Sequence, residues 1–163
     1  MKVSFWLAAL LIAATVPVKG AAGQDLPVSP PAQIAAGARA CLNAITREGL
    51  DARRLASDGW IGRNAGQGDA ATWSGSRTFR RDSVVLLELP TFRNCIVVAR
   101  IAGEADFLAV VTVLAQTMGV PEIDEDGMAR WTLADGKFVL AEVTGSPDQP
   151  GIAITVRAGG SLE

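Results

Sequence analysis

The chain has 163 residues, no His, no Tyr and two Cys, and its formal net charge is −2 at pH 7. Without His it can form neither a Ser-His-Asp nor a Cys-His catalytic site, and no His-ligated zinc or copper site. It also lacks a Gly-rich phosphate loop and a Cys-x-x-Cys pair, so we expect neither a cofactor nor a metal.

The N-terminal segment has the features of an export signal. Lys2 precedes the apolar run Phe5 to Val16, and the small residues Gly20 to Gly23 offer a signal peptidase site. The run is shorter than the roughly 20 residues of a membrane-spanning helix. We therefore expect residues 1–23 to be cleaved and the mature protein to be periplasmic or secreted, with no membrane insertion. A retained anchor is the alternative.

The mature chain has the size of one domain. We expect a Pro-rich, flexible lead-in over residues 24–31 and a single α+β domain over residues 32–160. In an oxidising compartment Cys41 and Cys95 are expected to form a disulfide, which would contribute about 4 kcal/mol to stability. The alternative is two free thiols, but a Cys nucleophile normally needs a nearby base, and the chain has no His.

Helical spacing predicts a first helix from about Pro30 to Glu48. Ser29 is expected to cap its start, and Gly49 its end. The apolar stripe of this helix consists of Ile34, Ala38, Cys41, Leu42 and Ile45. It places Cys41 on the buried side, within reach of a sheet.

Residues 51–82 are broken by glycines and are harder to interpret. Trp60 and Ile61 suit a short strand or a plug, Thr72 to Phe79 suits a strand, and Arg80 to Ser83 suits a turn. Beyond them the pattern is clearer. Val84–Leu89 and Cys95–Ile101 predict an antiparallel hairpin.

The C-terminal part is expected to start with a second helix over Gly103 to Met118, which Gly119 and Pro121 end. Three strands are expected to follow, with Asp135 and Gly136 as a hairpin signal. Their ranges are Met128–Leu133, Lys137–Thr144 and Ile152–Ala158.

The two halves of the mature chain have similar patterns. Phe79 corresponds to Trp131, and Glu88 corresponds to Glu142. The fold class we expect is therefore α+β, with two helix–three-strand units forming one antiparallel sheet of about six strands. Both helices would pack on one face of that sheet. An internal duplication would explain the similarity of the two halves. Chance similarity between amphipathic strands is the alternative.

Residues for partner binding are expected near the glycine-rich segment. Exposed aromatic residues and arginines are typical of interfaces, although burial in the core is the alternative for each aromatic. Nucleic acid is not an expected partner, because the Arg residues around Phe79 are the only approach to a basic stripe in an exported chain. The candidates are Trp60, Trp73, Arg77, Arg80, Arg81 and Phe92.

Acidic residues offer two further sites. The stretch from Pro121 to Gly127 could be a weak calcium loop or, more simply, a solvated linker. Glu88 and Glu142 could share a cleft as acid and base, but strand alternation would place each on the solvent side.

The leading functional hypothesis is an exported binding module for a protein partner, acting by occlusion as an inhibitor or immunity-like protein does. It rests on the absence of catalytic equipment in a stable, exported chain. The alternatives are a hydrolase that uses the paired carboxylates and an envelope-organising protein that works as an oligomer.

Overall fold

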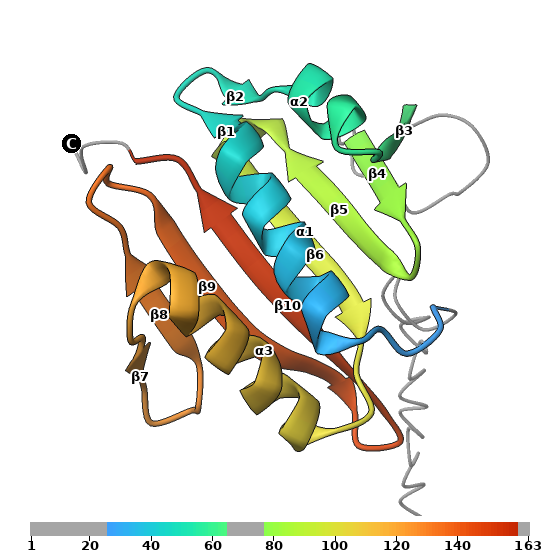
Figure 1. Cartoon of the computed structure of the whole chain (residues 1–163), viewed down its shortest axis with the longest axis vertical. Coiled ribbons are helices and arrows are strands. Elements are labelled where there is room, and N and C mark those ends of the chain that lie inside the picture. The colour runs from blue at the N-terminus through green and yellow to red at the C-terminus, as the bar shows by residue number, and fades with distance from the viewer. Residues whose placement is uncertain (1–25, 65–76, 160–163) are drawn as a thin grey trace, which may run out of the picture.

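The computed structural model describes residues 26–64 and 77–159, which form a mixed α+β fold (Figure 1). The helices are α1 (Pro31–Ala44), α2 (Ala52–Ser57) and α3 (Glu104–Met118). From one edge to the other, the large sheet contains β3 (Ile61–Asn64), β4 (Arg77–Arg81), β5 (Val84–Leu89), β6 (Asn94–Arg100), β10 (Gln149–Arg157), β9 (Phe138–Ser146), β8 (Ala129–Thr132) and β7 (Glu122–Ile123). The expected signal peptide lies outside the described residues.

All neighbouring strands of the large sheet are antiparallel. Helices α1 and α3 lie side by side on one face of this sheet (Figure 1). The expectation of an antiparallel sheet with two helices on one face is therefore confirmed at this coarse level. The core between the layers is built from buried apolar side chains such as Ile34, Leu86, Val97, Leu114 and Ile154.

The number of strands was underestimated. The sheet has eight described strands rather than about six, and four of them follow each long helix rather than three. The strand order leads from both edges to β6 and β10, the last strand of each half, which pair at the centre. β7 was missed because it has only two residues, Glu122 and Ile123, within a stretch interpreted as an acidic linker or calcium loop.

The predicted disulfide is confirmed. Cys41 of α1 is bonded to Cys95 of β6, their Cα atoms are 5.6 Å apart, and both side chains are fully buried. The bond joins the helix layer to a central strand. Gly37, one turn earlier, permits this close approach, because a Cβ there would lie 3.1 Å from side-chain atoms of both Val84 and Val97.

The first helix ends four residues earlier than predicted. After Ala44 the chain forms a small hairpin of β1 (Ile45–Thr46) and β2 (Gly49–Leu50). The β-branched residues Ile45 and Thr46 favour extended backbone, and the Thr46 hydroxyl donates to the Gly49 carbonyl at 2.9 Å. Gly49, at φ 130°, therefore closes this hairpin instead of capping the helix.

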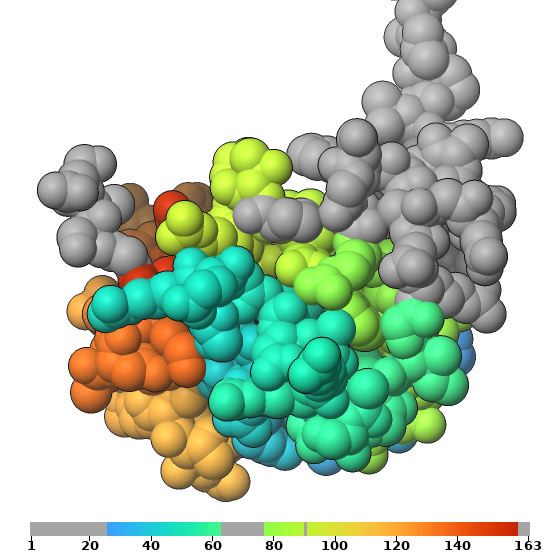
Figure 2. Space-filling model, turned by 90° about the horizontal axis from the view of Figure 1, so that it is seen from above, coloured from blue at the N-terminus to red at the C-terminus, as the bar shows by residue number. Residues whose placement is uncertain are grey.

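Helix α2 follows the hairpin directly and was not predicted. Asp51 caps it, because its carboxylate accepts hydrogen bonds from the backbone amides of Arg53 and Arg54. Leu55 fixes the short helix to the core. Figure 2 shows the domain from the end at which β1, β2 and α2 lie.

The chain before α1 is attached to the sheet. Ser29 donates its backbone amide to the Arg100 carbonyl at 2.9 Å, and Leu26 is buried. The Ser29 hydroxyl was expected to cap α1, but it donates to the Ser83 hydroxyl at 2.7 Å, and Pro30 occupies the cap position. The packed part of the chain thus begins before the predicted domain boundary at residue 32.

Candidate partner-binding surface

One face of the large sheet is apolar, although no described helix covers it. Side chains alternate along a strand, so residues that follow or precede the core residues Leu86, Val97 and Ile154 point away from α1 and α3. We call this side the open face. Its central row, in register across six strands, consists of Thr78, Leu87, Ile96, Thr155, Leu140 and Arg130.

A second row runs beside the first and is also largely apolar. It begins at the edge strand and consists of Ile61, Arg80, Val85, Val98, Ala153 and Glu142. Antiparallel sheets usually present polar side chains on an uncovered face. In both rows the four central strands instead contribute mostly aliphatic side chains, which are buried or partly buried.

Strand β5 shows most clearly that apolar side chains, rather than polar ones, point to the open face. Leu87 and Leu89 point to the open face, whereas Glu88 points to the helix side and is 4% exposed. Arg77 compensates the buried carboxylate, because its Nε donates to Glu88 and its Nη2 donates to the Leu50 carbonyl at 3.0 Å. The hydrogen bond to Glu88 raises the pKa of Arg77.

The expectation that both glutamates lie on the solvent side is therefore wrong for Glu88. Glu142 does lie on the open face, where it pairs in register with Ala153. Strands β6 and β10 separate the strands of the two glutamates. The two carboxylates consequently lie on opposite faces of the sheet and do not share a cleft.

The predicted aromatic and arginine patch is divided among several places. Trp60 is buried at 4% exposure, which matches the alternative of core packing. Trp73 lies outside the described residues. Arg77 forms the ion pair with Glu88. Phe92, in the short 3-10 turn Pro90–Phe92 between β5 and β6, is 54% exposed. Phe92 and Arg80 lie near opposite ends of β5.

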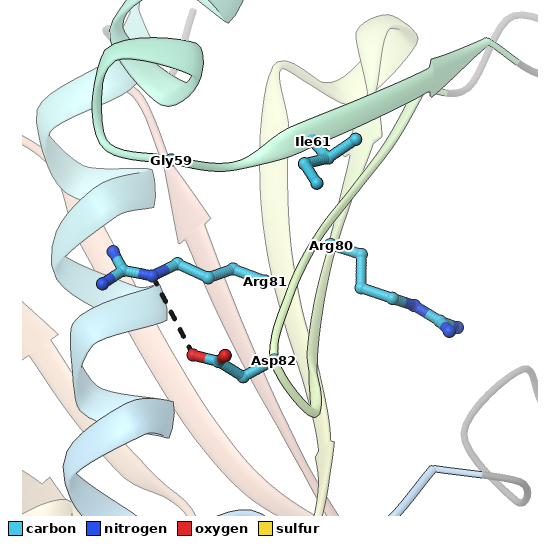
Figure 3. A pocket seen from close by; sticks show the side chains of 5 residues that line it. All are labelled: Gly59, Ile61, Arg80, Arg81 and Asp82. Atoms are coloured by element: carbon cyan, nitrogen blue, oxygen red, sulfur yellow. Dashed lines mark ion pairs between the residues drawn. The ribbon is translucent and has the colours of Figure 1, made fainter.

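Arg80 and Arg81 line one hollow of about 430 Å³ together with Gly59, Ile61 and Asp82. Figure 3 shows the two side chains leaving β4 in opposite directions. Arg81 donates to the Asp58 carbonyl at 2.8 Å and lies 4.0 Å from the Asp82 carboxylate. Arg80 instead belongs to the open face, beside Ile61, which is 71% exposed. The hollow therefore lies at one border of the open face.

Two further exposed arginines lie on the open face and were not identified from the sequence. Arg157 pairs in register with Asn94 and Phe138 near the middle of the sheet. Arg130 lies towards the other edge, where its guanidinium is 5.9 Å from the Phe138 ring centre and 3.8 Å from the Asp124 carboxylate. Their position depends on the pairing of β6 with β10, strands far apart in the chain, which no local pattern indicates.

Acidic groups on the described part of the open face are gathered near Arg130. Glu142 is there, and Glu122 of the edge strand pairs in register with Arg130. The side from β4 to β10 carries Arg80, Arg157 and the partly buried Arg100, whose guanidinium also donates to the Leu26 carbonyl at 3.4 Å. That side of the open face is consequently cationic as well as apolar.

The chain matches no protein-family model, no curated protein and no solved structure. Within residues 26–64 and 77–159, no helix is both long and apolar enough to cross a bilayer. The same residues contain no cluster of three acidic or Cys side chains arranged to hold a metal ion. The buried disulfide is compatible with a location outside the cytoplasm.

Proposed function

We propose that this protein is an exported binding module, acting in the periplasm or outside the cell, whose open face holds a protein partner and occludes it. The observation that carries this proposal is the inverted pattern of β5, in which Leu87 and Leu89 face outward while Glu88 is buried. Arg77 compensates the buried carboxylate, but the two leucines stay partly exposed to water, and covering them with a partner would be favourable.

The composition of the open face supports a protein partner. Interfaces combine an apolar centre with arginine and a polar rim, and the open face places Leu87, Ile96 and Leu140 between Arg80 and Arg130. The disulfide and the long central strands provide a rigid platform for this surface. A rigid platform lowers the ordering cost of binding.

Site-specific photo-crosslinking in living cells tests the proposal. A photoreactive residue at Thr155, in the centre of the open face, is expected to give a discrete adduct with another protein. The matched control is Thr112, which is exposed on α3 on the opposite side of the domain, and it is expected to give none. The proposal fails if Thr155 gives no adduct, or if both positions give the same adducts. An adduct with a second copy of this chain would favour the oligomeric alternative.

A further inference from the structure

The charged and apolar side chains of the open face indicate the chemistry of the partner. The inference drawn from them rests on the proposed function. We infer that the partner contributes an acidic amphipathic helix, which lies diagonally across the open face from Arg80 to Arg157. Three features lead to this inference: the position of the two arginines, the apolar side chains between them, and the hydrogen-bonding needs of a backbone placed on a sheet face.

The two arginines define a path across the sheet. Arg80 is on β4 and Arg157 is on β10, three strand spacings away. Along the strand direction they are four residues apart. Arg80 is in the same row as Ala153, and Ala153 precedes Arg157 on β10 by four residues. With strands about 4.8 Å apart and a rise of about 3.3 Å per residue, their Cα atoms are about 20 Å apart.

Apolar side chains fill this path. The partly exposed Leu87 and Ile96 occupy the row between those of Arg80 and Arg157. The partly exposed Val98 is in the row of Arg80, beside Val85, which is itself only 4% exposed. A ligand that follows the diagonal would therefore meet a cation at each end and aliphatic side chains between them. Carboxylates are the groups that arginine binds best, through paired hydrogen bonds, so the matching segment is acidic at both ends and apolar in the middle.

The backbone of that segment must satisfy its own hydrogen bonds. The strands under the diagonal are already paired on both sides, so an extended segment lying on the face would find no backbone partners. A helix has internal hydrogen bonds and can bury an apolar stripe on a sheet, as α1 and α3 do on the other face (Figure 1). At about 1.5 Å per residue, acidic residues about 14 positions apart would span the distance and share one helix face.

A membrane surface fits the open face less well than a helix. Insertion into lipid requires protruding apolar side chains, but Leu87, Ile96, Val98 and Leu140 are only partly exposed. Among the described residues of the open face, only Ile61 of the edge strand, at 71%, is a strongly exposed large apolar side chain, and it lies beside Arg80 at the border. Val120 at 93% lies after α3, and Phe92 at 54% lies in the turn after β5.

Designed peptides test the inference directly. The probe is a fluorescent, helix-forming peptide of about 18 residues with a leucine stripe and a Glu at each end of it, about 14 positions apart. The comparison peptide has Lys in place of both Glu. Fluorescence anisotropy with the mature, disulfide-bonded protein is expected to show binding at least about 10-fold tighter for the Glu peptide. Equal binding, or no binding of the Glu peptide at about 100 μM, overturns the inference.

Charge-reversal variants of the protein provide a second test of the inference. Arg80→Glu and Arg157→Glu are each expected to weaken the Glu peptide about 10-fold, and the double variant is expected to prefer the Lys peptide. The matched control is Arg53→Glu, an exposed arginine on α2, for which the Kd should stay within about 2-fold. An equal loss with Arg53→Glu would show that only overall charge matters and would contradict the inference.

The remaining outcomes separate the inference from the proposed function. Co-sedimentation with anionic phosphatidylglycerol vesicles is expected to show no binding, and binding that Arg80→Glu and Arg157→Glu abolish would replace the helix with a lipid surface. If Thr155 crosslinks to a protein but the Glu and Lys peptides bind equally, the binding function stands and the acidic helix is wrong. If Thr155 gives no adduct while the Glu peptide binds selectively, the open face is an acidic-helix site, but the proposed function fails.

Discussion

Arg77 and Glu88 face each other across β4 and β5 on the helix side of the sheet, and the pair connects the sheet to the β1–β2 hairpin. Glu88 is nearly inaccessible, whereas the Arg77 side chain is 40% exposed. The guanidinium reaches the Leu50 carbonyl at the same time. A single side chain thus neutralises a buried carboxylate and attaches a hairpin that follows α1.

Replacing Arg77 by Met is expected to destabilise the protein by about 2 kcal/mol, because the buried Glu88 carboxylate loses its partner. The double variant Arg77→Met with Glu88→Gln should recover part of this loss, since no buried charge is left. The free energy of unfolding from urea titrations measures both effects. Arg80→Met is the matched control on the same strand, and a loss as large as that of Arg77→Met would show that the ion pair is unimportant.

The disulfide is predicted to be a major contribution to stability. It joins residues 54 positions apart, and Cys41→Ser is expected to lower the free energy of unfolding by about 4 kcal/mol under oxidising conditions. Thermal unfolding with and without a reductant measures this. Reduced wild-type protein should resemble the variant, and an unchanged melting curve for Cys41→Ser would contradict the prediction.

The carboxylate of Asp135 is predicted to make stability depend weakly on pH. Hydrogen bonds from Lys137 lower the pKa of Asp135 below its usual value of 3.8. A lowered folded-state pKa adds stability above pH 3.8, and this is lost as the pH falls through the folded-state value. Because Asp135 is exposed to solvent, the effect should be below about 0.5 kcal/mol.

The measurement is a set of urea titrations of wild type and Asp135→Asn between neutral pH and the acid limit of folding. The difference in unfolding free energy between the two proteins should shrink as the pH falls below 3.8. Asp148→Asn, an exposed acid in the β9–β10 turn, measures the effect of removing any surface carboxylate. A difference that grows towards low pH would mean that the sign is wrong.

Local patterns in the sequence predicted part of the fold well. The hairpin of β5 and β6 and the helix α3 lie within a residue of their expected ranges, because each has a strong apolar pattern and a clear turn or stop signal. The disulfide was expected because an exported chain with two Cys residues usually pairs them, and helical spacing correctly placed Cys41 on the buried side of α1.

Features that depend on tertiary packing were not predictable in this way. Alternation predicted that Glu88 points to solvent, but Val84–Leu89 has apolar residues at both alternating sets of positions, and the prediction was wrong. The buried side chain of Glu88 has its charged partner, Arg77, on the neighbouring strand, which local patterns do not reveal. Likewise, Arg80 and Arg157 belong to one surface only through the pairing of β6 with β10.

Two adjacent leucines on β5 test whether the open face is free of covering structure. Leu86 is fully buried under the helices, and Leu87 points to the open face, where it is partly buried. Leu86→Ala is expected to cost about 3 kcal/mol of unfolding free energy, because it creates a cavity in the core. Leu87→Ala should cost about 1 kcal/mol, because its site is open to water and no cavity forms.

The two leucine variants are expected to rank in the opposite order when their affinity for the Glu peptide is compared. Leu87→Ala removes apolar surface from the diagonal between Arg80 and Arg157, so it is expected to weaken the Glu peptide about 5-fold. Leu86→Ala, measured at a temperature at which it stays folded, should leave the peptide Kd unchanged. Urea titration measures the stability of the two variants, and fluorescence anisotropy measures their Kd for the Glu peptide. If Leu87→Ala costs as much stability as Leu86→Ala, another part of the chain covers the open face, and the surface is not available to a partner.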